Sequence, residues 1–270
     1  MHIRRDRDSG IESVDARFEG HAYDPHDHDE MLVGVTLQGV QRFRCGRAQH
    51  TSTPGKSMLI EPGAVHDGHA PDDSGFTYAM LYLPQPWLAC MTERLGLPDI
   101  SRLSAFRHTL TDDARLGTAI HQAFQAVHRQ EGRLARDQYL DRLIVLLSGH
   151  LAGEAAPARS GNALQIERAR DVLHTCMSDD IGLDQLANRS GMDRFRLTRQ
   201  FKQMFGQSPH AYLVQLRLRA ARALLAAGRE PAQVAHEVGF ADQSHLGRWF
   251  QRAYRMTPAA YRRACTNVLD

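Results

Sequence analysis

The sequence predicts a two-domain α+β protein, in which a β-rich N-terminal half is followed by helices and then by an all-α C-terminal half. Short apolar runs separated by Gly, Pro, Asp and Ser fill residues 22–83, a spacing typical of a β-sandwich or barrel. Helical periodicity replaces this spacing from residue 112 onward. A helical pattern then occurs twice near the C-terminus. The length of 270 residues allows two domains of ordinary size.

The predicted β domain covers residues 1–110. Its expected strands include the apolar runs at residues 31–37, 41–45, 57–60 and 76–83. Each run has the length of an ordinary strand and is bounded by residues that favour turns. The domain is therefore expected to be a barrel or sandwich.

Two amphipathic helices are predicted within residues 111–152. One apolar stripe precedes Gly132 and a second follows it, at the three- and four-residue spacing of a helix. The residues of these stripes are Leu116, Ile120, Phe124, Val127, Leu140, Leu143, Ile144, Leu147 and Leu151. The helices either pack on the β domain or contact a second copy of the chain. Residues 153–162, rich in Ala, Pro, Ser and Gly, are the predicted linker to a last domain at 163–270.

The last domain contains a duplicated pattern. The pattern Leu-x-Arg-x-Phe-x-x-x-(Phe/Tyr)-x-x-(Ser/Thr)-Pro-x-x-Tyr begins at Leu197 and again at Leu246, a displacement of 49 positions. Its first apolar positions, at i, i+4 and i+8, form one face of a helix. The opposite face is basic and polar in both copies. Each copy therefore predicts a helix that buries one side and offers the other to a partner.

A shorter amphipathic segment precedes each copy and ends in glycine, Gly191 in the first and Gly239 in the second. Glycine suits the left-handed residue that closes a helix, and Asp193 and Asp242 are placed to cap the next helix. These features predict two helix-turn-helix motifs. Residues 209–227 predict a connecting helix about 28 Å long. Successive major grooves on one face of DNA lie about 34 Å apart.

The charge distribution supports a partner of negative charge. Residues 163–270 contain 16 Arg and Lys against 10 Asp and Glu, a net charge of +6, whereas residues 1–162 have a net charge of −4. A basic domain attached to a more acidic one is typical of a nucleic-acid-binding module. Only two of the 33 basic residues are lysines. Arginine, which can pair with guanine or clamp a phosphate, must supply most of the contacts.

The run from Ala235 to Gln251, continuing through Thr257 to Arg262, resembles the signature of the AraC/XylS transcription regulators. The resemblance covers about residues 163–263. It implies two helix-turn-helix motifs on one connecting helix, with double-stranded promoter or operator DNA as the partner and no enzymatic activity. It also implies a homodimer formed through residues 111–152, and contact with RNA polymerase if the protein is an activator.

The resemblance places the recognition helices at about residues 193–204 and 242–254. The side chains expected to read bases are Arg194, Phe195, Thr198, Arg199, Gln243, Ser244 and Arg248. Gln243 suits adenine and Arg248 suits guanine, because each can form two hydrogen bonds with its base. Lys202 and Arg252 are expected to contact phosphates. The alternative for any one of these arginines is a merely solvated helix face.

Three positions of the second copy depart from the family pattern. Arg255 stands where the first copy has Gly206, so this helix end must accept a non-glycine residue or a different turn. Leu246 replaces a phenylalanine. Gly247 has no side chain and can only allow close approach to DNA.

Two short motifs in the N-terminal half resemble those of a cupin barrel. The first contains His26, His28 and Glu30, and the second ends at His66. In metal-binding cupins the matching residues hold a divalent ion. Here Glu30 follows His28 more closely than in the enzymes, although residues i and i+2 would still share a face of a regular strand.

A metal-free, cupin-like sensor domain is the preferred interpretation, and no cofactor is predicted. Its polar side chains would hydrogen-bond a small-molecule effector or stabilise the mouth of the barrel. The candidate effector-binding residues are His26, His28, Glu30, His66, Tyr78 and Tyr82.

The remaining features predict a cytoplasmic protein. The opening residues contain no apolar core of a signal peptide, and no later run is long enough to span a bilayer. Cys45, Cys90, Cys176 and Cys265 form no C-x-x-C pair and indicate neither a zinc nor a disulfide framework.

The sequence as a whole predicts a transcription regulator whose promoter occupancy responds to an effector bound in the cupin-like domain. Two alternatives stay open at this point. One is a metal-dependent cupin enzyme with a helical appendage, and the other is a constitutive DNA-binding protein whose barrel is only structural.

Overall fold

The computed structural model describes residues 1–97, 106–152 and 161–266. The chain divides into two compact units, Met1–Glu154 and Ala155–Asp270, which are described separately below. Most of the predicted linker, residues 153–160, lies outside the described residues, and residues 161–162 belong to the first helix of the C-terminal unit.

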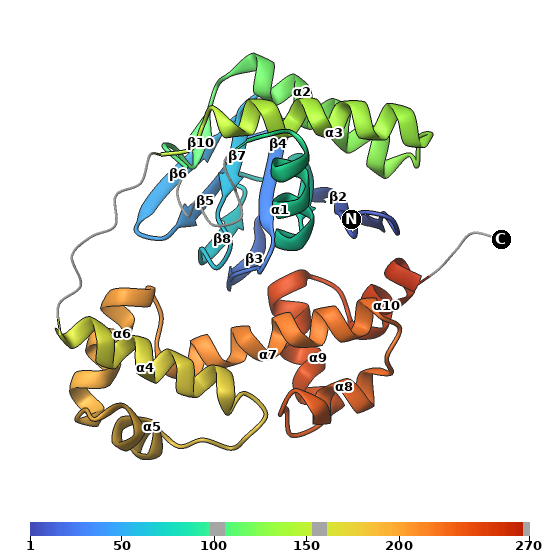
Figure 1. Cartoon of the computed structure of the whole chain (residues 1–270). Helices are drawn as coiled ribbons and strands as arrows, with labels where there is room; N and C mark the ends of the chain where they lie inside the picture. Colours follow the sequence, from blue (N-terminus) through green and yellow to red (C-terminus); the bar gives the residue numbers. More distant parts are fainter. Residues whose placement is uncertain (98–105, 153–160, 267–270) are drawn as a thin grey trace. The chain divides into compact units, whose positions relative to one another are not determined.

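The N-terminal unit contains two antiparallel sheets (Figure 1). One has six strands in the order β1-β2-β9-β4-β7-β10, and the other has four in the order β3-β8-β5-β6. The strands are β1 His2–Arg5, β2 Glu12–Phe18, β3 His21–His26, β4 Met31–Gly39, β5 Gln41–Cys45, β6 Ala48–Ser52, β7 Ser57–Ile60, β8 His66–His69, β9 Phe76–Leu83 and β10 Leu110–Thr111. The described strands form a cupin-like pair of sheets and do not close into one continuous barrel.

The six-stranded sheet is apolar on both faces because each face is covered. In β4, Leu32 joins the inner cluster between the sheets, while its neighbours Met31 and Val33 join a second cluster on the outer face. In β9, Tyr78 faces inward and Ala79 outward in the same way. This alternation follows from the two-residue period of a strand.

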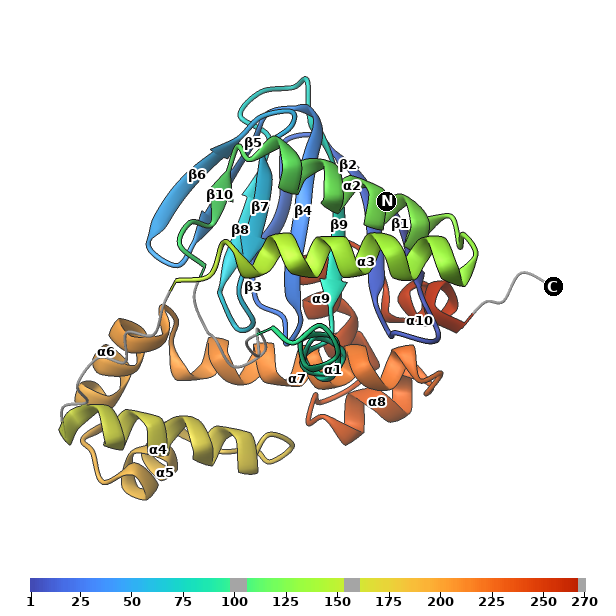
Figure 2. The same ribbon diagram turned by 45° about the horizontal axis from the view of Figure 1, so that its top comes forward.

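Three helices cover the outer face of that sheet: α1 Gln85–Arg94, α2 Ala114–His128 and α3 Arg133–Ser148. Figures 1 and 2 show α2 and α3 side by side across it. The two predicted apolar stripes of residues 116–151 lie in this layer and are buried. Both helices are therefore part of the N-terminal unit's own core.

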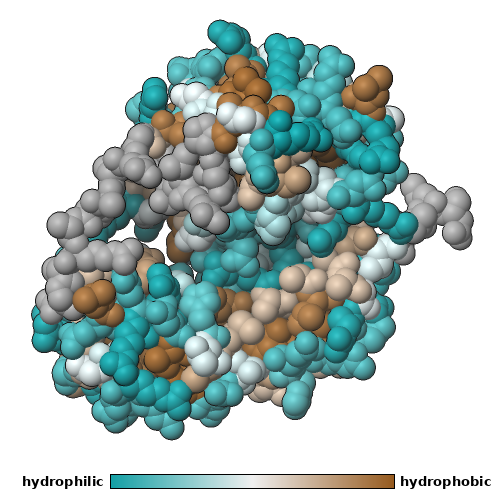
Figure 3. Space-filling view, viewed as in Figure 1, coloured by the Kyte–Doolittle hydropathy of each residue, from teal (hydrophilic) through white to brown (hydrophobic). Residues whose placement is uncertain are grey.

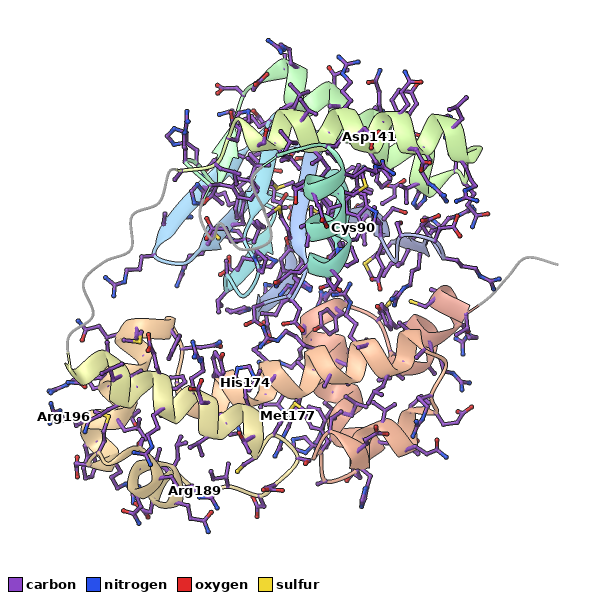
Figure 4. All side chains as sticks on the ribbon, in the orientation of Figure 1. Cys90, Asp141, His174, Met177, Arg189 and Arg196 are labelled. Atoms are coloured by element: carbon purple, nitrogen blue, oxygen red, sulfur yellow. The ribbon has the colours of Figure 1, made fainter. Side chains whose placement is uncertain are left out.

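The C-terminal unit is entirely helical in its described residues. Its helices are α4 Gly161–Thr175, α5 Leu183–Ser190, α6 Arg194–Phe205, α7 Pro209–Ala226, α8 Pro231–Glu237, α9 Gln243–Tyr254 and α10 Pro258–Thr266. The pairs α5–α6 and α8–α9 are the two predicted helix-turn-helix motifs, and α7 joins them. His174 of α4 lies beside α7 (Figure 4), where its Nε2 is 3.0 Å from the hydroxyl oxygen of Tyr212. The predicted α+β two-domain fold is confirmed.

Left-handed residues close the helices of both motifs. Gly191 after α5 has φ 69° and Gly239 after α8 has φ 87°, as glycine at these turns predicts. The recognition helix α6 is closed by Gly206, with φ 75°, and the matching residue after α9 is Arg255, with φ 55°. The second motif therefore keeps the same turn without glycine, at a conformational cost of about 1–2 kcal/mol.

The two helix-turn-helix motifs meet at a contact that we call the motif junction, formed by residues 177–179, Arg217 and Gly239. Arg217 of α7 donates hydrogen bonds to the carbonyl oxygens of Met177 and Asp179, each at 2.8 Å. A Cβ placed on Gly239 would lie 2.7 Å from the carbonyl oxygen of Ser178. The backbone of the second motif thus packs directly on the segment that leads into the first.

Candidate DNA interface and effector site

The recognition helices α6 and α9 are built alike. The Asp193 carboxylate accepts hydrogen bonds from the backbone N–H groups of Phe195 and Arg196, at 2.9 and 3.1 Å. Asp242 accepts one from His245 at 2.7 Å. Both predicted caps are confirmed. They satisfy backbone donors that a helix start leaves without a helical partner, and so fix where each recognition helix begins.

The repeated apolar positions form the buried side of these helices. Leu197, Phe201, Leu246 and Phe250 are all 0% exposed. Ala187 of α5 and Ala235 of α8, the small residues before each turn, are also buried. Their size allows the two helices of each motif to cross closely.

The opposite side of α6 is exposed. Phe195 is 76% exposed, an unusual position for a phenylalanine, and Arg199 and Lys202 are exposed beside it. Arg194 forms an ion pair with Asp184 of α5 at 3.2 Å. Thr198 is half-buried, and its hydroxyl donates to the carbonyl oxygen of Arg194.

In Figure 3 hydrophilic residues cover much of the visible face of the C-terminal unit, and more hydrophobic residues form a band across its middle. Arg196 extends outward from α6 in Figure 4, away from the core of the unit.

On α9, the candidate base-reading residues Gln243, Ser244 and Arg248 are exposed. A Cβ on Gly247 would meet no described atom within 4 Å, so packing among the described residues does not require glycine at this position.

Two residues of α9 escaped the sequence analysis. Trp249 donates a hydrogen bond from its indole N–H to Nε2 of His245 at 3.0 Å, and the guanidinium of Arg252 lies 5.2 Å from the Trp249 ring centroid. The sequence signal for these contacts was the spacing, because residues three or four positions apart are neighbours on a helix surface. The stacking orients Arg252, the predicted phosphate contact.

In the N-terminal unit, the structure brings three of the predicted effector residues together. His26, His28 and His66 each offer a ring nitrogen, and these atoms lie within 4.8 Å of one another. We call these residues the histidine group. They are 4%, 2% and 3% exposed. His26 and His66 are direct cross-strand partners on β3 and β8, which explains why the two motifs converge.

Backbone carbonyls orient two of these rings. Nδ1 of His26 donates to the carbonyl oxygen of Asp24 at 2.8 Å, and Nδ1 of His66 donates to that of Ala64 at 2.9 Å. A carbonyl oxygen only accepts, so the proton lies on Nδ1 of each ring. Burial lowers the pKa of His66 below its ordinary value.

The other predicted effector residues take different positions. Tyr82 packs edge-on against His28, with ring centroids 4.9 Å apart. Tyr78 is buried in the inner cluster, where its ring stacks with that of Phe18. Glu30 lies in the bend after β3, is half-buried and is not a member of the histidine group. Because β3 ends at His26, the strand regularity assumed for residues 26–30 does not hold.

Sequence analysis also missed Tyr23 and Gln41. Tyr23 packs edge-on against His26, with centroids 5.0 Å apart, and its hydroxyl accepts a hydrogen bond from Gln41 at 3.0 Å. Burial raises the pKa of Tyr23 far above its ordinary value. The three-residue separation of Tyr23 and His26 normally puts two strand residues on opposite faces. A register shift between them brings both inward.

Two helix-turn-helix motifs with exposed basic faces, joined to a β-rich unit, define a DNA-binding transcription regulator with a separate second domain. The family described as AraC-like ligand binding domain matches residues 9–144, and the one described as helix-turn-helix domain matches residues 186–264. The chain belongs to the AraC family of transcription regulators.

Curated relatives agree with this membership, and a solved structure shares the fold. The HTH-type transcriptional regulator YbfI of Bacillus subtilis is 26% identical over 85% of this chain and 84% of its own. The MmsAB operon regulatory protein of Pseudomonas aeruginosa is 24% identical over 97% and 80%. Unsaturated fatty acid-bound ToxT of Vibrio cholerae has a TM-score of 0.62 and 12% identity, and covers 96% of each chain.

The relatives that match over at least 76% of both lengths are named as regulators, which indicates a regulator rather than an enzyme. Within the described parts of the chain, no helix is both long enough and apolar enough to cross a membrane.

Proposed function

We propose that this chain binds specific DNA sequences and that its promoter occupancy responds to a small effector held in the N-terminal unit. One observation carries the proposal. Two recognition helices each bury an apolar stripe and leave a basic, polar face exposed, while α7 and the motif junction hold them on one support. Two such faces can read two segments of one duplex.

In the second motif, we assign Gln243 and Arg248 to base edges, with Ser244 beside them. Glutamine pairs with adenine and arginine with guanine through two hydrogen bonds each. The open space around Gly247 supports a role in close backbone approach to the DNA. Arg252, oriented by Trp249, is assigned to a phosphate.

In the first motif, Phe195 and Arg199 are assigned to base edges. An exposed phenylalanine can contact the methyl group of thymine. Thr198 lies between them on the same face. Arg194 must give up its ion pair with Asp184 to reach a base, and this exposed pair costs at most about 1 kcal/mol to break. Lys202 is assigned to a phosphate.

The effector site is assigned to the histidine group with Glu30, Tyr78 and Tyr82. The three histidines are buried together, Tyr82 packs against His28, and Tyr78 lies in the apolar cluster between the sheets. ToxT has been crystallised with an unsaturated fatty acid, but its 12% identity with this chain relates the folds alone. The buried histidines favour an effector that binds imidazole nitrogens.

The proposal includes a homodimer formed through α3. Leu134 and Val145 are 85% and 49% exposed and lie eleven residues apart, which places them on one face of the helix. Hydrophobic residues are visible on the surface of the N-terminal unit in Figure 3. The regulator would act on DNA in the cytoplasm, with RNA polymerase as a further partner if it activates transcription.

Selection from randomised DNA duplexes with the full-length protein tests the proposal. We expect an enriched motif with two separated segments, one for each recognition helix. Operator affinity is then measured across a panel of metal ions and metabolites. Failure to enrich any sequence at low salt would overturn the DNA-binding part. Constant affinity across the panel would instead indicate a constitutive DNA-binding protein.

A further inference from the structure

The histidine group has the composition of a metal centre. Its three ring nitrogens lie within 4.8 Å of one another, and the ring centroids are 4.7 to 5.3 Å apart. The three imidazoles converge from β3, from β8 and from the segment that follows β3. Imidazole nitrogen is a preferred ligand of zinc, copper, iron and nickel ions.

The backbone presents two of the rings in the form that a metal ion requires. Nδ1 of His26 and Nδ1 of His66 each donate to a carbonyl oxygen two residues earlier, so Nε2 of each ring keeps its lone pair. Metal-binding histidines are usually held by such a hydrogen bond from the second ring nitrogen. Pairing of β3 with β8 further fixes the separation of the two residues.

The surroundings favour an occupant of atomic size. Tyr23 and Tyr82 pack edge-on against the histidine group, with centroid distances of 5.0 and 4.9 Å. Phe18 packs in turn on Tyr23 and Tyr78, at 5.9 and 6.0 Å. These rings lie directly beside the imidazoles or pack on rings that do, so an organic effector would have to fit among them. An ion bound between the three nitrogens displaces none of them.

We propose that the histidine group binds one divalent transition-metal ion through Nε2 of His26, Nε2 of His66 and one ring nitrogen of His28. Nitrogens that share a tetrahedral zinc ion lie about 3.4 Å apart, so ring nitrogens that lie within 4.8 Å of one another need to close by up to about 1.4 Å. Glu30 is not required. The sequence analysis preferred a metal-free sensor and found Glu30 unusually close to His28, but the three histidines supply a set of ligands without Glu30.

Three protein ligands leave at least one coordination position open. Because all three ligands are neutral, the bound ion keeps its double positive charge and favours water or an anionic oxygen donor there. This inference rests on the proposed function, since it identifies the chemistry of the effector site as metal-based.

Cobalt titration of the full-length protein tests this inference. The purified protein is stripped with a chelator, and Co²⁺ is added while the visible absorption bands are recorded. We expect one Co²⁺ per chain, with the intense bands of a four- or five-coordinate site, and displacement by Zn²⁺. Wild-type protein that takes up no Co²⁺ at micromolar concentrations would overturn the inference.

Variants locate the ion. His26→Gln and His66→Gln should each lower Co²⁺ affinity by at least about 100-fold, the upper end of the effect of losing only an outer hydrogen bond. The control is the double variant His21→Gln/His69→Gln, which alters the cross-strand pair at the other end of β3 and β8. It should bind Co²⁺ like the wild type. Undiminished binding by His66→Gln, with folding checked by circular dichroism, would contradict the assignment.

DNA binding of the same preparations separates the two proposals. Wild-type protein that enriches a DNA motif but takes up no metal would leave the proposed function intact and overturn the metal site. Protein that binds one ion but selects no duplex would do the opposite.

Discussion

Arg248 is exposed on α9 and is one of the two side chains that we assign to base edges in the second motif. Alanine lacks the guanidinium group that we assign to guanine. We therefore expect Arg248→Ala to weaken the preference for one base at one operator position. The expected loss of discrimination is about 1–3 kcal/mol. Binding-site selection with the full-length variant measures it, and an unchanged motif would show that Arg248 does not read a base.

Lys202 is exposed on α6 but should act through charge alone. Lys202→Ala is expected to weaken binding to all sequences alike and to reduce the slope of log K against log salt by about 1, because one fewer counterion is released. Fluorescence anisotropy at several salt concentrations measures this slope. A change in sequence preference without a change in slope would assign Lys202 to a base instead.

Residue roles were predictable where local geometry determines them. Asp193 and Asp242 cap helices through contacts with residues two or three positions away, so spacing alone revealed them. Tyr23 was missed because its inward position depends on a register shift in the pairing of β3 with β8. A glycine partner, Gly68, also accommodates the Tyr23 ring, since a Cβ there would lie 2.5 Å from it. Neither fact can be read from one strand alone.

At the scale of elements, the motif junction positions one recognition helix relative to the other. Gly239→Ala adds a Cβ 2.7 Å from the Ser178 carbonyl oxygen and also strains a residue with φ 87°. We expect lower stability of the C-terminal unit, and a larger loss of affinity for a two-segment operator than for either segment alone. Thermal unfolding and DNA titration measure the two effects.

Gly228→Ala is the matched control for that variant. Gly228 has φ 89°, but a Cβ there would be 3.6 Å from its nearest neighbour, Thr266. Both variants therefore include the conformational cost of about 1–2 kcal/mol, and only Gly239→Ala disturbs Ser178. Equal effects of the two on DNA binding would show that the junction does not align the motifs.

The helical elements were more predictable than the sheets. Each helix-turn-helix motif is specified by caps, a glycine turn and an apolar stripe within a few dozen residues. The strands β4, β5, β7 and β9 were recognised as apolar runs, but the other strands and the order of the strands in the sheets were not. The central strand β9 pairs with residues of β2 and β4 that lie at least 37 residues earlier in the chain, and no local pattern specifies such pairing.

At the scale of the whole molecule, we assign the proposed dimer contact to the exposed apolar face of α3. Replacing Leu134 and Val145 with glutamate puts charge on the face assigned to the dimer, so we expect the double variant to be a monomer. Light scattering coupled to size-exclusion chromatography measures the mass. Leu164→Glu, at a 59% exposed leucine of the C-terminal unit, is the control and should leave the mass unchanged. A dimeric double variant would place the interface elsewhere.

The motif junction has a consequence for the operator itself. Arg217 and the Ser178–Gly239 contact hold the two helix-turn-helix motifs together. The recognition helices α6 and α9 are therefore not expected to rotate freely relative to each other. Inserting about five base pairs between the two segments turns one of them to the far side of the duplex. Such a promoter should escape control. An insertion of about ten base pairs returns both segments to the same side of the duplex, but it separates them by more than α7 can span.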